Sequence, residues 1–151
     1  MPFTNTSEAR LESLIVKWLV EQNHYEQGKS TDFDKSYALE PSRLLRFLKD
    51  TQPDSVAKLQ LESSTQKRDQ FFTRVRDEIT KRGIIDVLRK GIKAYPASLI
   101  TFYMTPSVRN PSAATLFAKN IFSVTRQLHF SPDETKLALD LCVFINGLPV
   151  I

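Results

Sequence analysis

The chain has 151 residues, of which 41% are hydrophobic and 25% charged, and its formal net charge is +4. This composition is typical of one soluble domain and excludes intrinsic disorder, and no apolar run is long enough to cross a bilayer. The N-terminus lacks the basic and apolar parts of a secretion signal, and a single cysteine, Cys142, excludes a disulfide framework and a multi-cysteine metal site. We therefore expect a cytoplasmic protein without a membrane segment.

The first two thirds of the chain have the periodicity of short helices. A first helix is predicted to begin near Asn5, because apolar residues then recur at helical spacing and would face the core. These residues are Leu11, Leu14, Ile15, Trp18 and Leu19. Further helices are predicted to start at Pro41, Pro53, Ser63 or Ser64, and Ile84. Gly83 and Gly91 end the last two of them.

From Ala97 onward the period changes to that of strands. Segments 98–105, 121–130 and 137–145 predict strands, and 107–120 predicts a loop. Within 121–130, Phe122, Val124, Arg126, Leu128 and Phe130 share one face. The dipeptide Asn146–Gly147 predicts a type I′ hairpin turn before a returning strand at 148–151. Such a short last strand indicates that residues 1–151 are the N-terminal part of a longer protein or a truncated reading frame.

Two carboxylates stand near predicted core positions. Asp140 interrupts an apolar run that we expect to be buried, where an ionised group without a partner is costly. A salt bridge at the exposed side of the strand is the simpler explanation. Glu8 borders the predicted inward face of the first helix and Glu12 flanks it, although Glu8 also fits a helix cap. The more specific hypothesis pairs Asp140 with Glu8 at a Mg²⁺ site, since hard oxygen ligands suit that ion.

Arg126 lies on the apolar side of its predicted strand, between Val124 and Leu128. Three roles fit this position: neutralising a buried carboxylate, contacting a phosphate, or extending into solvent from the strand end. Gln127 and His129 lie on the polar side, and neither has a Ser, Cys or Asp arrangement that indicates nucleophilic catalysis. Arg126 and Gln127 are therefore predicted to contact DNA or a carboxylate.

The chain contains, in this order, the segments SEARLESLIVKWL, LLRFLKDTQPD, RGIIDVLRKGI, FSVTRQLHFS and LALDLCVFINGLPV. Together they resemble the N-terminal region of the restriction (R) subunit of type I restriction–modification enzymes. The resemblance covers nearly the whole chain, and the last two segments are its most specific parts. In that family the region is a nuclease domain of the PD-(D/E)xK superfamily. The resemblance therefore implies an α/β (α+β) fold in which helices precede a mixed sheet with a restriction-endonuclease-like core.

The resemblance also implies roles for individual residues. Asp140 corresponds to the metal-binding aspartate, Glu8 to the helix carboxylate, and Glu12 is the second choice for that position. The implied cofactor is Mg²⁺, which polarises the scissile phosphate and lowers the pKa of an attacking water. The implied partners are double-stranded DNA and the modification and specificity subunits, and the full protein would couple cleavage to ATP-driven translocation.

The sequence departs from the family pattern at its end. An E-x-K motif should follow the hairpin, but no Glu or Lys follows Asp140, and no Walker-type glycine loop occurs. We expect these 151 residues to be inactive, or nearly so, by themselves. Two alternatives stay open: a non-catalytic remnant or module that binds DNA or partner subunits, and another nuclease branch of the same superfamily. Basic residues of the fourth helix could contact DNA, although their alternation with acidic residues is more typical of a solvated face.

Overall fold

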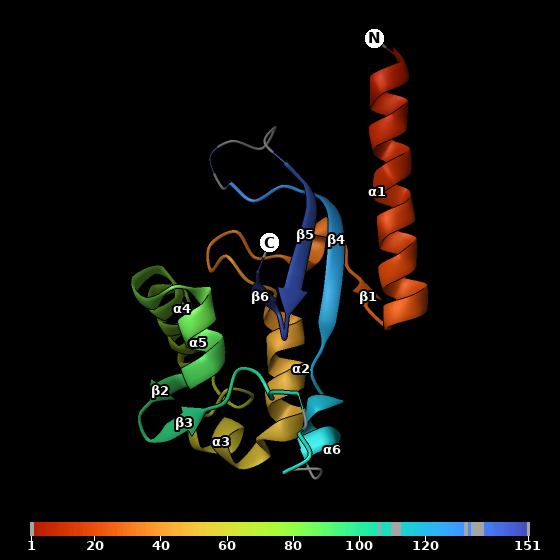
Figure 1. Cartoon of the computed structure of the whole chain (residues 1–151). Helices are drawn as coiled ribbons and strands as arrows, with labels where there is room; N and C mark the ends of the chain where they lie inside the picture. The colour runs from red at the N-terminus through yellow and green to blue at the C-terminus, as the bar shows by residue number, and fades with distance from the viewer. Residues whose placement is uncertain (1, 106, 110–112, 132, 134–137, 151) are drawn as a thin grey trace.

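The computed structural model describes residues 2–105, 107–109, 113–131, 133 and 138–150. They form an α/β fold in which helices lie against a mixed sheet (Figure 1). Two ends of predicted strands, Leu137 and Ile151, lie outside the described residues. Within the part described, no helix combines the length and the hydropathy that crossing a membrane requires.

Four of the helices begin where the sequence predicts, whereas the first begins at Pro2, so the predicted start near Asn5 is wrong. The helices are α1 (Pro2–Asn23), α2 (Pro41–Thr51), α3 (Pro53–Lys58), α4 (Thr65–Arg82), α5 (Ile84–Lys90) and α6 (Ala113–Phe117), with a 3₁₀ turn, η1, at Ser30–Asp32. Ser64 is the N-cap of α4, and its Oγ accepts a hydrogen bond from the Lys67 N–H at 3.2 Å. Pro41 and Pro53 occupy the first turns of α2 and α3, and α5 ends at Gly91, so these predictions are confirmed.

A four-stranded sheet has the order β1-β4-β5-β6. Its strands are β1 (Glu26–Gln27), β4 (Phe122–Leu128), β5 (Leu139–Ile145) and β6 (Leu148–Pro149). The sheet is mixed because β1 runs parallel to β4 whereas the other pairs are antiparallel. A separate hairpin joins β2 (Ile92–Ala94) to β3 (Ala97–Leu99). The two-residue strand β1 is not predicted, because it is short and polar, and the predicted loop at 107–120 is wrong over α6, which has only five residues.

The predicted strand at 98–105 is wrong beyond Leu99. After that residue, side chains replace a strand ladder as partners of the backbone. The amide of Gln52 bonds both the N–H and the C=O of Ile100, at 2.8 Å each. The amide of Asn120 does the same for Tyr103, at 3.1 and 2.7 Å. The segment therefore needs no neighbouring strand, because side-chain amides satisfy backbone groups at Ile100 and Tyr103.

The main core lies between helices α2–α5, the β2–β3 hairpin and β6, and includes the fully buried Phe47 and Leu61. The Asn146–Gly147 turn docks on this core. Both residues have positive φ, 53° and 83°, so the predicted type I′ turn is confirmed. The Gly147 C=O accepts a hydrogen bond from the Glu40 N–H at 2.8 Å, and a Cβ at Gly147 would lie 2.6 Å from the Glu40 carbonyl oxygen. A glycine is therefore required both by φ and by the close approach of α2.

Helix α1 stands beside β4, and its first turns extend past the end of the strand (Figure 1). The predicted inward face is wrong. Leu11, Leu14 and Trp18 are 58–59% exposed, whereas Val16 is 5% exposed and packs inward. The helix carries apolar residues on two sides, and the side with fewer of them faces the sheet. We call Leu11, Leu14, Ile15 and Trp18 the outer stripe of α1.

Candidate functional site

Four polar residues meet where α1 passes the end of β4: Glu12, Arg126, Gln127 and Asp140. We call them the acidic site. Gln127 Nε2 lies 3.5 Å from Glu12 Oε2 and 3.5 Å from Asp140 Oδ1, so one amide bridges the two carboxylates by long hydrogen bonds. Because both oxygens approach the same nitrogen, the two carboxylates converge on one small region. The sequence separates them by well over one hundred positions, and the fold brings them together.

The backbone of β4 has an unusual conformation at Gln127, the residue between the two carboxylates. Its φ is +51°, a left-handed conformation that is strained for a residue with a side chain. The register pairs Arg126 with Leu141 and Leu128 with Leu139. Leu128 nevertheless packs in a cluster with Cys142 and Phe144, not on the side of Arg126. The predicted alternation of β4 therefore fails after Arg126, because the strand twists at the residue that faces the carboxylates.

Arg126 attaches α1 to the sheet. One terminal nitrogen forms an ion pair with Glu12 Oε2 at 3.2 Å and lies 3.4 Å from the Ala9 carbonyl oxygen, and the other donates to Ser13 Oγ at 3.1 Å. The guanidinium therefore contacts three groups within about one helical turn, and Glu12 is left only 15% exposed. In the described part of the chain, no group accepts a hydrogen bond from the buried Arg126 Nε. These contacts fix the rotation of α1 about its axis.

The structure separates the predicted site residues into two sets. Arg126, Gln127, Asp140 and Glu12 come together, whereas Glu8 is exposed one turn earlier on α1. The expectation that Asp140 is buried is wrong, since its side chain is exposed opposite Gln127 at the open end of β5. Water therefore solvates this carboxylate, and the cost of burial that drew attention to it does not arise. Its proximity to Glu12 is what makes it notable.

The acidic site brings together two carboxylates, Glu12 and Asp140, whose oxygens are of the kind that Mg²⁺ prefers. This ion is usually held by one or two carboxylates together with water and phosphate oxygens, and Glu12 and Asp140 meet the first requirement. Among the described residues no cluster of three or more His, Cys, Asp or Glu side chains could hold a metal. The ion pair with Arg126 occupies one oxygen of Glu12, so a cation here would share that carboxylate with a guanidinium.

Comparison with known proteins supplies the family. The family model described as "Type I restriction enzyme R protein N terminus" matches residues 5–151. The chain belongs to this family. No curated protein and no solved structure gives a significant match. The assignment therefore rests on the family model alone. The matched residues include both Glu12 of α1 and Asp140 of β5.

Sequence reasoning missed a second charged group, which supports β4 from the other side. Glu40 is fully buried, and its carboxylate accepts hydrogen bonds from Arg43 at 2.7 Å and from Ser123 of β4 at 3.0 Å. Burial raises the pKa of Glu40, although Arg43 and Ser123 act in the opposite direction. The guanidinium of Arg43 also contacts Glu26 and Asp32. This group, which we call the buried charge cluster, ties α2 to β1, η1 and β4.

Proposed function

We propose that the chain forms the nuclease part of a type I restriction enzyme R subunit, and that Glu12 and Asp140 are its Mg²⁺-binding carboxylates. The observation that carries the proposal is the convergence of these two carboxylates on Gln127, in a chain of the R-protein family. Glu12 takes the helix position in place of Glu8, because Val16 and the Arg126 contacts turn the Glu12 side of α1 toward the sheet. In the full protein, cleavage of double-stranded DNA would be coupled to ATP-driven translocation, in a cytoplasmic complex with the modification and specificity subunits.

Each residue has a defined task under this proposal. Glu12 and Asp140 supply oxygen ligands, and Gln127 holds the two carboxylates at a fixed separation before the cation arrives. Arg126 positions Glu12 through its ion pair and stands close enough to the carboxylates to meet a DNA phosphate once Glu12 engages a cation. Bound Mg²⁺ supplies Lewis-acid polarisation of the scissile phosphate and a more acidic water. The second motif carboxylate and the lysine of E-x-K do not occur after Asp140 in these 151 residues.

Metal binding is tested by titrating the chain with Mg²⁺ and following amide shifts by NMR. We expect shifts centred on Glu12, Gln127 and Asp140. Glu12→Gln and Asp140→Asn should each weaken binding about tenfold or more, since each removes one of two charged ligands. Glu8→Gln is the matched control, one turn away on the same helix. Loss of binding on Glu8→Gln but not on Glu12→Gln would show that the other glutamate is the ligand.

Cleavage is tested in two proteins. The 151-residue chain alone should not nick plasmid DNA with Mg²⁺, because the sequence after Asp140 supplies no lysine to position water. The full-length R subunit in its complex should cut DNA, and Asp140→Ala should abolish cutting while ATP hydrolysis continues. Nicking by the short chain that disappears with Asp140→Ala would contradict the first expectation. A full-length Asp140→Ala variant that still cuts DNA would contradict the assignment of the site.

A second candidate is a non-catalytic module that binds DNA or partner subunits. Two observations favour it: the acidic site contains only two carboxylates, Glu12 and Asp140, and Glu12 already has an arginine partner. The basic residues of α4 are weak support, because Arg74, Arg76 and Arg82 each form an ion pair with a neighbouring carboxylate. Salt-dependent DNA binding that survives Asp140→Asn, without cleavage by the full-length complex, would support this candidate.

A further inference from the structure

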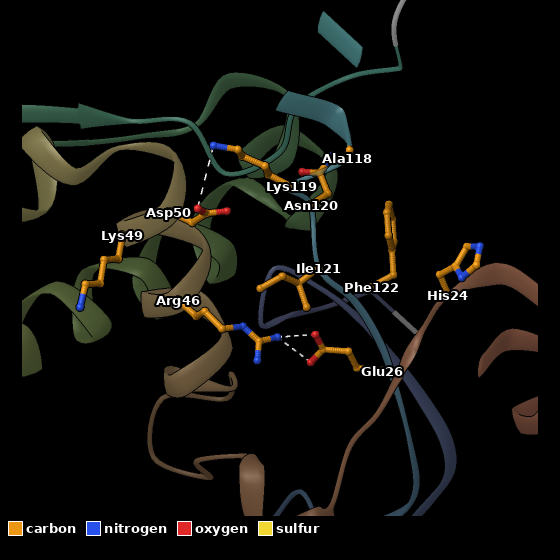
Figure 2. Close-up of a pocket in the computed structure, with 10 residues that line it drawn as sticks. All are labelled: His24, Glu26, Arg46, Lys49, Asp50, Ala118, Lys119, Asn120, Ile121 and Phe122. Atoms are coloured by element: carbon orange, nitrogen blue, oxygen red, sulfur yellow. Dashed lines mark hydrogen bonds and ion pairs between the residues drawn. The ribbon is translucent and has the colours of Figure 1, made fainter. Parts of the chain in front are cut away.

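A cavity of about 670 Å³ lies at the start of β4, at the other end of this strand from the acidic site. It is lined by α2, by the segment that enters β4, and by the connection from α1 to β1 (Figure 2). Its lining residues are His24, Glu26, Arg46, Lys49, Asp50, Ala118, Lys119, Asn120, Ile121 and Phe122. At about 3.3 Å per residue, the five positions from Phe122 to Gln127 separate the cavity from the acidic site by roughly 17 Å.

One wall of the cavity is aromatic. Phe122 is half-buried and packs against three other rings, with centroid separations of 5.5 Å to Tyr25, 6.5 Å to Phe102 and 6.4 Å to Phe117. These three rings hold Phe122 in place, and Phe122 also lines the cavity. A rigid, half-exposed aromatic ring offers a flat surface for stacking at little cost in side-chain entropy.

Cations whose partners are solvent-exposed carboxylates also line the cavity. Arg46 bonds both carboxylate oxygens of Glu26, and the two side chains are about half exposed. Lys119 Nζ lies 3.9 Å from Asp50 Oδ1, at the limit of an ion pair. Lys49 points away from the cavity in Figure 2, toward its partner Glu62. Exposed pairs of this kind contribute little to stability, so a phosphate can take the place of the carboxylates next to Arg46 and Lys119.

The side-chain amide of Asn120, which also lines the cavity, already forms hydrogen bonds within the protein. The Asn120 amide bonds both backbone groups of Tyr103 and also accepts from the Asn146 side chain at 3.1 Å. It therefore holds this part of the wall rigid, and its oxygen, which already accepts two hydrogen bonds, cannot accept another from the edge of a base. A ligand that stacks on Phe122 and places a negative charge by Lys119 would need no contact with a base edge.

We propose that this cavity binds one nucleotide of single-stranded DNA, with its base against Phe122 and its phosphate between Arg46 and Lys119. Aromatic rings beside a row of cations are the usual means of binding single strands without sequence preference. The choice of DNA as the source of the nucleotide rests on the proposed function, whereas the stacking and charge contacts do not. The distance between the cavity and the acidic site corresponds to about five base-pair steps of duplex DNA, at 3.4 Å per step.

The test is a fluorescence-anisotropy titration of the 151-residue chain with a labelled ten-nucleotide poly(dT) strand. EDTA is present, so that failure of the Mg²⁺ proposal leaves the result unaffected. The same strand in duplex form and free thymidine monophosphate are the other arms. We expect the single strand to bind more tightly than either, with similar affinity for poly(dA). Equal binding of the free monophosphate would overturn the assignment to DNA, and tighter binding of the duplex would overturn the stacking mode.

Variants separate the two kinds of contact. Phe122→Leu should weaken single-strand binding by roughly 5- to 150-fold, because base stacking is lost while apolar volume is kept. Phe130→Leu is the aromatic control, since Phe130 is 38% exposed beyond the other end of β4. Lys119→Gln should reduce the slope of log affinity against log salt by about 0.7, whereas the exposed Lys81→Gln on α4 should leave it unchanged. Equal effects of each variant and its control would overturn the proposal, and Lys119→Gln serves as the test if Phe122→Leu fails to fold.

Discussion

Replacing Arg43 of the buried charge cluster should lower the stability of the fold by an amount that can be worked out from its contacts. Its side chain is 11% exposed and its guanidinium bonds the carboxylates of Glu40, Glu26 and Asp32. Arg43→Met keeps most of the length of the side chain but removes the charge. Glu40, whose side chain is 1% exposed, would then keep Ser123 as its only other bond from a side chain in the described structure.

The magnitude follows from burial. Removing one partner of a buried ion pair typically costs about 3–5 kcal/mol, because an uncompensated charge is left behind. Glu26 and Asp32 are 42% and 36% exposed, so the loss of their pairs adds at most about 1 kcal/mol each after screening by solvent. We therefore expect Arg43→Met to lower the free energy of unfolding by about 3–7 kcal/mol at pH 7, a large share of the stability of an ordinary domain.

The sign of the pH dependence follows from the three carboxyl groups. Burial raises the pKa of Glu40, and loss of Arg43 would raise it further, so the cost of its charge disappears as the pH falls. Burial also acts to raise the pKa of Glu26 and of Asp32. For Glu26, hydrogen bonds and attraction from Arg46 and Arg43 outweigh burial and hold the pKa below the ordinary 4.5. For Asp32, the hydrogen bonds and attraction of Lys29 and Arg43 do the same and hold the pKa below the ordinary 3.8. Ionised Glu26 and Asp32 therefore stabilise the wild type at pH values above these ordinary pKa values. This stabilisation is lost as the pH falls through their lowered pKa values. Both effects make the deficit of the variant smaller in acid.

Urea unfolding followed by circular dichroism at pH 7 and pH 4 measures this deficit. The matched control is Arg46→Met, one turn further along α2, because Arg46 also pairs with Glu26 but is 55% exposed. We expect the control to change the free energy of unfolding by less than about 1 kcal/mol. If the two variants lose similar stability, or if the deficit of Arg43→Met grows toward pH 4, the argument from burial is wrong.

Three further predictions concern other parts of the fold. Gly28→Ala should lower the melting temperature in a thermal scan, because the added Cβ would lie 2.5 Å from Thr125 Oγ1; an unchanged melting point would mean that β1 shifts freely. Trp18, the single tryptophan, is 59% exposed, so its fluorescence should be red-shifted and quenched strongly by acrylamide, whereas blue-shifted, protected emission would show that the outer stripe of α1 is covered in solution. Burial, with a smaller contribution from Glu40, raises the pKa of the Cys142 thiol to about 11, so iodoacetamide at pH 8 should label it slowly until urea is added, and rapid labelling of folded protein would contradict this.

Much of the fold is predictable because its signals are local. The prolines at 41 and 53, the Ser64 cap and the Asn146–Gly147 turn each act within a few residues, and all are confirmed. The error at 98–105 has a different origin. Its β-branched and aromatic residues suit an extended chain, but Gln52 and Asn120 satisfy the backbone there from a distance in sequence. No pattern within the segment could show that these amides replace a neighbouring strand.

The candidate site was predictable in its residue types but not in its arrangement. Asp140 and Arg126 stand out because charge is rare in apolar strands, and this holds wherever the side chains point. The choice between Glu8 and Glu12 depends on how α1 is rotated. Hydrophobicity alone predicts that the outer stripe faces the core. In the structure, three contacts from the Arg126 guanidinium turn the Glu12 side of the helix toward the sheet instead. A long-range polar contact of this kind leaves no periodic signal in the sequence.

The outer stripe of α1 has a practical consequence for mutational scans. Replacing Leu11, Leu14 or Trp18 by glutamine should leave the melting temperature of the 151-residue chain nearly unchanged, because water already surrounds these side chains. Any defect that the same replacements cause in a larger assembly would then arise outside this domain. These three positions therefore work as reporters that separate damage to the fold from damage to whatever the helix touches.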